Sequence, residues 1–533
     1  MYSDIHLARN LDALKRIGAA LPALTRPGDA IRLESHAGEV RLEVRLPDGS
    51  WALHPGPEWD AANEAVDAIM VGAGDGSRLE EALASSAQRR VLVIEPDPGV
   101  MLLLLSSRDW TGVIEAGRLA LVSGPTYAGA ANAAHLLRGD PPATLLLDPL
   151  DAMRLPQTAL AGRLLAERLA REAATNARAR RRLAGPYLLQ SLANLPALAR
   201  ESNAAALRGR FAGVPIVLVA AGPSLDRTLP SLRNLQDRAL IVAADTTLRP
   251  LLAGGVRPHL MVSIDPSELN ARHLSDVADV EGIFLAAEGS LHPRAFDSFT
   301  GRTFGFRISD HEPWRALRSH GVDLGLVRAW GSVATAAFDL ALQLQAGPVI
   351  FTGHDFAYSG NRPYCDNTRF HDEWRAYLAH NPGTIEHYED QMMNGRPTVE
   401  VRDILGCPVR TGTQLIAFRE WIVDQASAHP EVTFINATEG GILEAPHIRQ
   451  STLETVLAPF PARTDLRDRL RAAHRAGAGS LDRADRVLRS MLDQPDGGSW
   501  NTWVAFSGGA LSRDSLASAA GDAVSRWPTP TEA

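Results

Sequence analysis

Apolar, strand-like segments recur through the middle of this sequence, and helical patterns lie between most of them. These segments span residues 215–226, 239–245, 259–265, 282–288, 303–309, 348–355 and 432–436. Apolar strands that alternate with helices are typical of a parallel sheet covered by helices on both faces. We therefore predict an α/β fold with a doubly wound parallel sheet in this part of the chain.

The regions on either side have different patterns. Residues 30–54 alternate apolar and polar side chains, which predicts short antiparallel strands with a turn at Pro47-Asp48-Gly49. Residues 67–98 then show a strand, glycine turn, helix and second strand, and an Arg-rich helical stretch follows at about 158–183. The last part of the chain has amphipathic helical patterns and no strand signal. We predict a Rossmann-like N-terminal domain (1–185), a central sheet domain (186–445) and a helical C-terminal domain (446–533).

Lysine is almost absent from the chain. Lys15 is the single lysine among 54 basic residues, in a sequence of 533 residues with net charge −8. A P-loop needs Gly-Lys-Ser/Thr and a pyridoxal enzyme needs a Schiff-base lysine, so both classes are excluded. The negative net charge, and the lack of aromatic residues in the densest basic run, Arg178–Arg182, argue against nucleic acid as a partner. Arginine must supply any fixed positive charge.

Cysteine and histidine usage points away from a protein-held metal. Cys365 and Cys407 are the only cysteines, too few for a disulfide framework or a zinc quartet. Four histidines fall in one stretch without the spacing of a zinc-binding helix: His354, His371, His380 and His387. The N-terminal sequence lacks the apolar core of a signal peptide, and no apolar run approaches the roughly 20 residues of a membrane span. We expect a cytoplasmic protein with no membrane insertion and no metal.

Polar residues follow the predicted strands at the points where these strands end. In an open parallel sheet, ligands bind beyond the carboxyl ends of the strands, at a switch in strand order. A single Asp or Ser in such a place is often the N-cap of the next helix, but six such strand ends together predict a binding edge. The main members are Gly222, Pro223, Ser224, Asp245, Thr246, Asp265, Glu288, His354, Asp355 and Glu439. Ser332 and Thr335 begin a helix led by small residues, which favours either an anion at its N-terminus or tight packing on the sheet.

Several motifs, in this order, resemble the motility-associated factor (Maf) family of flagellin glycosyltransferases. They are AAGPSLDRTLPSL (220–232), IVAADTTLRPLLAGGVRPHLMVSIDP (241–266) and WGSVATAAFDLALQLQAGPVIFTGHDFAYSG (330–360). The same core is shared with 6-hydroxymethylpterin pyrophosphokinase-like proteins. The resemblance continues at 412–422 and 435–443, and in the N-terminal region at 10–16, 72–76 and 91–98.

The resemblance implies an activity and a set of roles. Maf proteins transfer a nonulosonic acid, of the pseudaminic or legionaminic type, from its CMP-activated form to Ser or Thr hydroxyls of flagellin. This modification serves flagellum assembly and motility, and the central domain is similar in fold to bacterial sialyltransferases. The resemblance implies CMP-nonulosonic acid as the donor, flagellin as the partner and no required cofactor. By position, Gly222, Pro223, Ser224, Asp245 and Thr246 would bind the nucleotide, Asp265, Glu288, Ser332 and Thr335 would complete the pocket, and Asp355 and Glu439 would face the sugar or the acceptor.

The chemistry of this transfer needs a general base near neutral pH for the acceptor hydroxyl. Asp355 is favoured because it ends a predicted strand beside Gly353. His354 is a second candidate, although its side chain should point to the opposite face from Asp355 at strand spacing. Glu288 is the third. The donor carboxylate and phosphate need cationic or N–H partners, which helix N-termini can supply without lysine.

Two other functions remain open. One is diphosphate transfer from ATP to a hydroxymethyl pterin, in which Asp245, Asp265 and Asp355 would hold Mg²⁺ with the nucleotide phosphates. The other is a flagellin-binding accessory protein whose transferase site is vestigial. The loop 357–372, which carries Tyr358, Arg362 and Tyr364, is a candidate lid or acceptor-binding loop in the transferase.

The N-terminal region holds a further motif. Gly72-x-Gly74-x-Gly76 follows a predicted strand, and Glu95 ends the next strand, as in the S-adenosylmethionine site of class I methyltransferases. In such sites an acidic residue usually lies two positions before the first glycine, and here that position is Met70. The motif is therefore compatible with a bound cofactor or with a retained fold that binds none.

Overall fold

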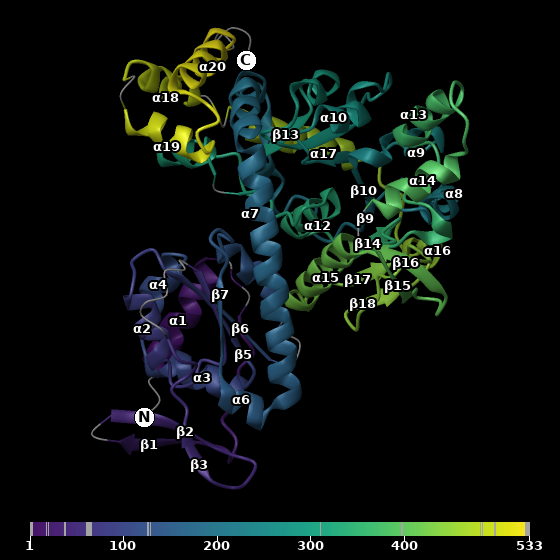
Figure 1. Ribbon diagram of the computed structural model, residues 1–533. Helices are drawn as coiled ribbons and strands as arrows, with labels where there is room; N and C mark the ends of the chain where they lie inside the picture. The colour runs from purple at the N-terminus through teal and green to yellow at the C-terminus, as the bar shows by residue number, and fades with distance from the viewer. Residues whose placement is uncertain are drawn as a thin grey trace. The chain divides into compact units, whose positions relative to one another are not determined.

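The computed structural model describes residues 4–17, 19, 21–36, 39–59, 67–124, 127, 129–309, 311–395, 398–479, 481, 483–494 and 497–527. The chain divides into two compact units, residues 1–180 with 427–429 and residues 181–426 with 430–533. A single helix, α7 (Pro156–Leu198), continues from the first unit into the second (Figure 1). The predicted α/β class is confirmed, and the two units are described separately below.

The first unit contains an antiparallel and a parallel sheet. The antiparallel sheet consists of β1 (Ile31–His36), β2 (Glu39–Arg45) and β3 (Trp51–Leu53). The parallel strands are β4 (Asp67–Val71), β5 (Arg90–Glu95), β6 (Leu119–Ser123) and β7 (Thr144–Leu147). The helices are α1 (Asp4–Arg16), α2 (Ser77–Ala84), α3 (Pro98–Ser107), α4 (Thr111–Glu115), α5 (Ala130–Ala133) and α6 (Pro149–Arg154). The predicted antiparallel strands and the strand–helix–strand pattern of 67–98 are confirmed.

The order of the parallel strands, β6-β5-β4-β7, places the first strand of the sheet in its interior. The chain moves from β4 to β5 and β6 on one side and then crosses to β7 on the other, which is the order of one half of a Rossmann sheet. The switch in strand order therefore lies between β4 and β7. Every residue of β4 is buried, because apolar helices cover both faces of the sheet.

The second unit is built on a nine-stranded sheet in which every described pair is parallel. Its strands are β8 (Ser202–Asn203), β9 (Ile216–Val219), β10 (Leu240–Ala244), β11 (Leu260–Ser263), β12 (Phe284–Glu288), β13 (Thr303–Phe306), β14 (Val349–Thr352), β17 (Phe434–Asn436) and β18 (Ile448–Gln450). The strands from β9 to β14 are buried throughout, as expected for a sheet covered on both faces. The predicted doubly wound parallel sheet is confirmed.

The strand order is β18-β17-β14-β9-β10-β11-β12-β13-β8. The chain proceeds from β9 through β10, β11 and β12 to β13 on one side and then returns to place β14 on the other side of β9. The pair β9–β14 has Val219 opposite Thr352, so the two loops that follow these strands leave the sheet together. The second switch in strand order therefore lies between β9 and β14.

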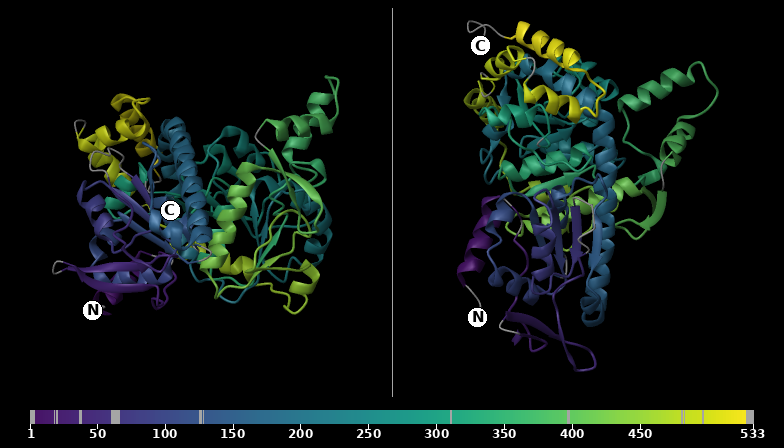
Figure 2. Two further views of the ribbon diagram at one scale, coloured as in Figure 1. Left: turned by 60° about the horizontal axis from the view of Figure 1, so that its bottom comes forward. Right: turned by 60° about the vertical axis from the view of Figure 1, so that its left-hand side comes forward.

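The helices of the second unit follow the strands or form excursions from them. They are α8 (Leu225–Leu235), α9 (Leu248–Ala253), α10 (Glu268–Ser275), α11 (Trp314–Ser319), α12 (Val333–Gln343), α13 (Arg369–Leu378), α14 (Ile385–Asn394), α15 (Thr413–Ala428), α16 (Leu453–Leu457), α17 (Leu466–Gly477), α18 (Ala484–Leu492), α19 (Gly498–Phe506) and α20 (Arg513–Ser525). Helices α13 and α14 (green) project away from the nine-stranded sheet (Figure 2). A hairpin of β15 (Thr398–Arg402) and β16 (Pro408–Gly412) follows them.

The C-terminal segment 446–533 is mainly helical, as predicted, but it begins with β18. The expectation of no strand after residue 445 is therefore wrong, because a three-residue edge strand with two exposed side chains has no recognisable apolar run. The sequence also missed β8 and the β15–β16 hairpin. Helices α18–α20 lie together (Figure 1), and their apolar residues, such as Trp500 and Leu516, belong to the same core as Leu188 and Val217. The structure therefore groups this segment with the central sheet in one compact unit.

Candidate functional site

The loops that follow β9 and β14 meet at the second switch point. Gly222 N donates to the Gly353 carbonyl at 2.9 Å, and Ala220 N donates to the Thr352 carbonyl at 3.0 Å. A Cβ atom on Gly222 would collide with the carboxylate of Asp355. Glycine is needed at position 222 because the two loops are in van der Waals contact.

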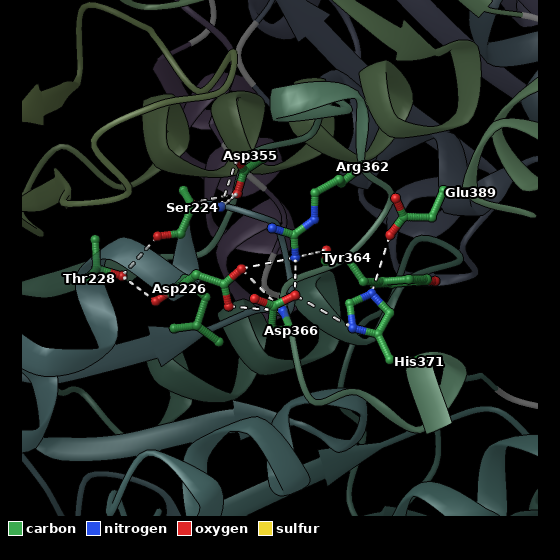
Figure 3. Close-up of polar contacts among 10 residues, drawn as sticks. Ser224, Asp226, Thr228, Asp355, Arg362, Tyr364, Asp366, His371 and Glu389 are labelled. Atoms are coloured by element: carbon green, nitrogen blue, oxygen red, sulfur yellow. Dashed lines mark hydrogen bonds and ion pairs between the residues drawn. The ribbon is translucent and has the colours of Figure 1, made fainter. Parts of the chain in front are cut away.

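Ser224 and Asp355, both predicted site residues, form a buried pair across this switch point. The Ser224 hydroxyl donates to Asp355 Oδ2 at 2.6 Å, and its backbone N–H lies 3.3 Å from both carboxylate oxygens (Figure 3). Ser224 is the N-cap of α8, so the carboxylate sits at the positive end of that helix. Burial raises the pKa of Asp355, while the hydrogen bonds from Ser224 act in the opposite direction. Asp355 is thus a buried carboxyl group with an elevated pKa, and it lies at the point where ligands bind in such sheets.

His354 has a different environment from its neighbour Asp355. Its ring lies near Phe351 and Phe356, and its Nδ1 donates to the Thr352 carbonyl at 3.0 Å. Burial lowers the pKa of His354 to about 4, so the ring is neutral at physiological pH. The imidazole is packed among aromatic side chains, in agreement with the expectation that it points away from the Asp355 carboxylate.

Glu288 ends β12 and is far from the Ser224–Asp355 pair. Its Oε2 accepts from the Ser290 N–H at 2.7 Å and from the Ser290 hydroxyl. Burial raises the pKa of Glu288 to about 7. Four strand spacings of about 4.8 Å separate β12 from β14, so the two strands are roughly 19 Å apart. Glu288 and Asp355 therefore cannot act on one hydroxyl at the same time.

Asp245 and Thr246 lie at the end of β10, directly beside β9. Asp245 Oδ2 accepts from the Ser263 hydroxyl at 2.6 Å and from Asn270 Nδ2 at 2.8 Å, and Oδ1 accepts from Thr246 N at 2.7 Å. Asp265, after β11, is exposed and accepts from the Ser267 N–H at 2.8 Å. The edge is therefore polar over three adjacent strands, with Asp245 buried and Asp265 open to solvent.

Ser332 and Thr335 are at the N-terminus of α12, as predicted. Helix α12 runs into β14, so its N-terminus faces the carboxyl edge of the sheet. The Ser332 hydroxyl accepts from Ala334 N at 3.3 Å. Thr335 Oγ1 accepts from Trp330 N at 2.8 Å and donates to the Ser332 carbonyl at 2.6 Å. Ser332 therefore caps the helix, and the Thr335 hydroxyl is hydrogen-bonded within the same turn. An anion at this N-terminus stays a prediction.

A cavity of about 470 Å³ lies beside the Ser224–Asp355 pair, at the ends of β17 and β18. Its lining residues are Arg227, Ile404, Leu405, Asn436, Glu439, Gln450 and Ser451. Arg227 donates to the Glu439 carbonyl across it. A Cβ on Gly440 would lie 3.1 Å from Arg227 and 4.0 Å from Ser224, and a Cβ on Gly441 would collide with the Asp355 backbone. The Gly-Gly sequence therefore lets the cavity wall lie close to the pair, and Glu439 is one of the residues of that wall.

Sequence reasoning missed Arg227 and Gln450 as cavity residues. Arg227 could have been identified from the sequence, because it lies one helical turn after Ser224 on a helix that begins at the predicted edge. Gln450 could not, since it belongs to the unpredicted β18.

The larger cavity, of about 680 Å³, lies at the other edge of the sheet. It is lined by residues that include Phe284, Arg302, Arg471 and His474. Phe284 is the first residue of β12, so this cavity faces the amino ends of the strands. The rule that ligands bind beyond the carboxyl ends favours the smaller cavity as the site.

The predicted lid loop 357–372 is tied back to the loop after β9. Arg362 Nη2 donates to Asp226 Oδ2 at 3.0 Å and to Asp366 Oδ1 at 2.8 Å (Figure 3). Burial raises the pKa of Asp226, and Arg362 opposes that shift. Tyr364 stacks on Phe370 with ring centroids 5.0 Å apart. The guanidinium and this ring thus hold the loop in place.

A second polar contact lies at the end of the loop. His371, on α13, has Nε2 3.2 Å from Glu389 Oε1 on α14 (Figure 3). Tyr358 N donates to the Arg410 carbonyl at 2.8 Å, which links the start of the loop to β16. Both ends of the loop are therefore anchored to the excursion formed by α13, α14 and the β15–β16 hairpin.

The glycine turn of the first unit contacts the chain itself. A Cβ on Gly74 would collide with the backbone of the segment His54–Gly56, and Asp75 N donates to the His54 carbonyl at 2.8 Å. Glu95, the candidate ribose ligand, accepts from the Ala73 N–H at 2.7 Å. These contacts account for both features of the motif without a cofactor.

The comparisons bear on the second unit. Residues 189–361 match the family model of 6-hydroxymethylpterin diphosphokinase MptE-like proteins. The match includes both sides of the β9–β14 switch point, and the predicted resemblance of the core is confirmed. The chain is also similar to a solved structure, that of a Maf glycosyltransferase from Magnetospirillum magneticum AMB-1. The similarity covers 99% of this chain and 92% of that chain, at 17% sequence identity and a TM-score of 0.45. A comparison with curated proteins finds no match.

Within the described part of the chain, none of the helices combines the length and the apolar character needed to cross a bilayer.

Proposed function

We propose that the second unit is a glycosyltransferase that transfers a nonulosonic acid from its CMP-activated form to Ser or Thr hydroxyls of flagellin. The proposal extends to a sialyltransferase-like central domain, no required cofactor and a cytoplasmic location. The observation that carries it is the β9–β14 switch point, where Ser224, Asp355 and a cavity lined by Arg227 come together. Two of the motifs that resemble the Maf family, 220–232 and 330–360, contain the loops that meet at this point.

The donor binds across the strand ends in this proposal. Arg227 is an exposed cation at the cavity and can pair with the phosphate or the donor carboxylate, in the absence of lysine. The N-terminus of α8 already holds the Asp355 carboxylate, so Arg227 is a better phosphate partner than that helix end. Asp245 and Thr246, on the other side of β9, are placed to bind the ribose and base. Glu439 faces the sugar or the acceptor from the cavity wall.

Asp355 is the proposed general base. Among the three candidates it alone combines a titratable carboxylate, an elevated pKa and a place at the switch point. His354 is packed between aromatic rings, and Glu288 is four strands away. The acceptor hydroxyl takes the place of the Ser224 hydroxyl as the donor to Asp355 Oδ2, and its proton moves to that oxygen as the glycosidic bond forms. The bond between the anomeric carbon and the phosphate oxygen breaks in the same step, and CMP leaves with the electron pair.

The test compares ligands and then variants. CMP at about 100 times its Kd should stabilise the protein by about 2.7 kcal/mol, read as a rise in Tm. Asp355→Asn should keep this response but lose about 10²- to 10⁴-fold in transfer from CMP-nonulosonic acid to flagellin, measured by mass spectrometry. The matched control, Glu288→Gln, should stay within about threefold of wild type. Equal losses in the two variants, or full activity of Asp355→Asn, would exclude Asp355 as the base.

A diphosphokinase is the second candidate, and the family match of residues 189–361 favours it. That reaction uses ATP with Mg²⁺, and Asp245, Asp265 and Asp355 would be the metal ligands. Stabilisation by ATP with Mg²⁺ and none by CMP would select this function. A chain that binds flagellin and supports motility equally well with Asp355→Asn is instead an accessory protein.

A further inference from the structure

Three side chains from separate parts of the first unit meet at the β4–β7 switch point. His54 follows β3, Asp148 is the N-cap of α6, and Asp151 lies within α6. We call this group the His54 cluster. His54 Nδ1 is 3.4 Å from Asp148 Oδ2, and His54 Nε2 is 3.3 Å from Asp151 Oδ1. One nitrogen or oxygen atom of each side chain lies within 4.8 Å of those of the other two.

The polar atoms of the cluster are buried and under-satisfied. His54 and Asp151 have no exposed surface, and Asp148 is 4% exposed. Both ring nitrogens of His54 and the Oδ2 atom of Asp151 are without a hydrogen bond. Buried polar atoms are normally hydrogen-bonded, so an imidazole that faces two carboxylates without a hydrogen bond to either leaves a place for a shared cation.

The surroundings carry an excess of negative charge. Asp151 also pairs with Arg154 at 3.0 Å, and Arg154 reaches Asp97 at 2.9 Å. Glu95, which is fully buried, adds a further carboxyl group that interacts with Asp151 and His54. Burial raises the pKa of Glu95, so the negative charge comes from Asp97, Asp148 and Asp151. Three carboxylates therefore face one guanidinium and one imidazole, which favours a bound cation.

We propose that the His54 cluster binds a first-row divalent cation of the Zn²⁺ type, through one ring nitrogen of His54 and the carboxylates of Asp148 and Asp151. An imidazole ligand selects such an ion over Mg²⁺ or Ca²⁺, which prefer oxygen. Ligand atoms about 2.1 Å from a tetrahedral ion are about 3.4 Å apart, and each ring nitrogen of His54 lies at about this distance from the oxygen of one carboxylate, Nδ1 from Asp148 and Nε2 from Asp151. One ligand atom of each side chain lies within 4.8 Å of the other two, so an ion on one ring nitrogen would draw the farther carboxylate inward. Glycine at position 72 leaves room for the group, because a Cβ there would approach Asp151 Oδ2 to 2.5 Å.

The site has a structural role. It links the segment after β3 to α6 and holds that segment on the glycine turn, where a nucleotide would otherwise bind. The rival interpretation is a proton in place of the metal, which would leave His54 as an imidazolium between two carboxylates. Only the metal site predicts that the protein binds one equivalent of the ion, so metal binding distinguishes the two interpretations.

The experiment uses the full chain, stripped with EDTA and titrated with Zn²⁺ or Co²⁺. Wild type should bind one equivalent, show visible ligand-field absorption with Co²⁺ and gain Tm as free Zn²⁺ rises. His54→Gln should weaken Zn²⁺ binding by about 100-fold or more. The matched control is His371→Gln, which removes another buried histidine beside a carboxylate and should bind as wild type does.

Two results would overturn the proposal. One is wild-type protein that binds no equivalent of Zn²⁺ and shows no Co²⁺ absorption, which requires no variant to fold. The other is a Zn²⁺ affinity that is the same in wild type and His54→Gln. If His54→Gln does not fold, Asp148→Asn takes its place in the comparison.

Discussion

The two parallel sheets of this chain each have a switch in strand order, and the chain uses the two points in opposite ways. Between β4 and β7, the segment His54–Gly56 lies on the glycine turn and the His54 cluster fills the sheet edge. Between β9 and β14, glycines also bring loops into contact, but a cavity of about 470 Å³ remains beside them. A switch point can thus receive either a ligand or a piece of its own chain, and a glycine-rich turn is compatible with both.

The largest expected effect is at the closed switch point. Gly74→Ala places a Cβ against the backbone of the segment His54–Gly56 at a φ of +55°, so we expect a loss of about 3 kcal/mol or more in the free energy of unfolding. Gly117→Ala is the matched control, because Gly117 has a φ of +64° and no neighbour within 4 Å. That variant should lose only about 1 kcal/mol. Urea denaturation of both variants measures the difference. Equal losses in the free energy of unfolding would mean that the segment His54–Gly56 can move aside at little cost.

A smaller effect concerns a buried acid at the edge of the second sheet. The pKa of Glu288 is raised to about 7 from an ordinary value of 4.5, so this carboxyl stabilises the fold below pH 4.5 and loses that contribution as pH rises through 7. Glu288→Gln cannot ionise. Its stability relative to wild type should therefore increase by about 2 to 3 kcal/mol between pH 5 and pH 8.

Urea unfolding at the two pH values tests this expectation. A constant difference between Glu288→Gln and wild type would mean that Glu288 stays ionised in the folded protein. Glu288 at β12 would then be an ionised carboxylate, and it could no longer be described as a buried neutral acid in contrast to Asp355 at the switch point.

The smallest effect is at the open switch point. Gly222→Ala should push the loop after β9 away from Gly353 and Asp355 and shift the start of α8, which carries Arg227, so CMP should bind about tenfold more weakly. Gly521→Ala, in α20 of the same unit with no neighbour within 4 Å, should leave CMP binding unchanged. Titration calorimetry measures both. Unchanged affinity of Gly222→Ala would separate the Ser224–Asp355 pair from the nucleotide site.

Periodicity predicted the long buried strands well and the short ones poorly. The strands β9, β10, β11, β12 and β14 all lie within predicted segments, since three to five consecutive apolar residues between helical patterns identify a strand buried on both faces. The edge strands β8 and β18 have two and three residues and carry no such pattern. The failure to predict β18 matters for function, because Gln450 of this strand lines the cavity.

The prediction of the site residues was likewise partly right and partly wrong. The rule that ligands bind beyond strand ends brought Ser224 and Asp355 into one prediction from positions 131 residues apart, and they are hydrogen-bonded. The rule does not rank strand ends, so it placed Glu288 in the same group although its strand is four positions away. Strand order is a tertiary property and cannot be read from local sequence.

Local sequence was sufficient for the α/β class, the parallel strands and the exclusion of lysine-dependent chemistry, because these depend on residue type and short-range periodicity. Tertiary structure alone decided which of the two switch points is filled. His54 lies about a hundred residues before Asp148 and Asp151 in the chain and becomes their neighbour only when the segment after β3 folds onto the sheet. The same holds for the cavity, whose lining comes from α8, β17, β18 and the β15–β16 turn. Contacts over such separations are selected by the packing of the whole unit rather than by any local pattern.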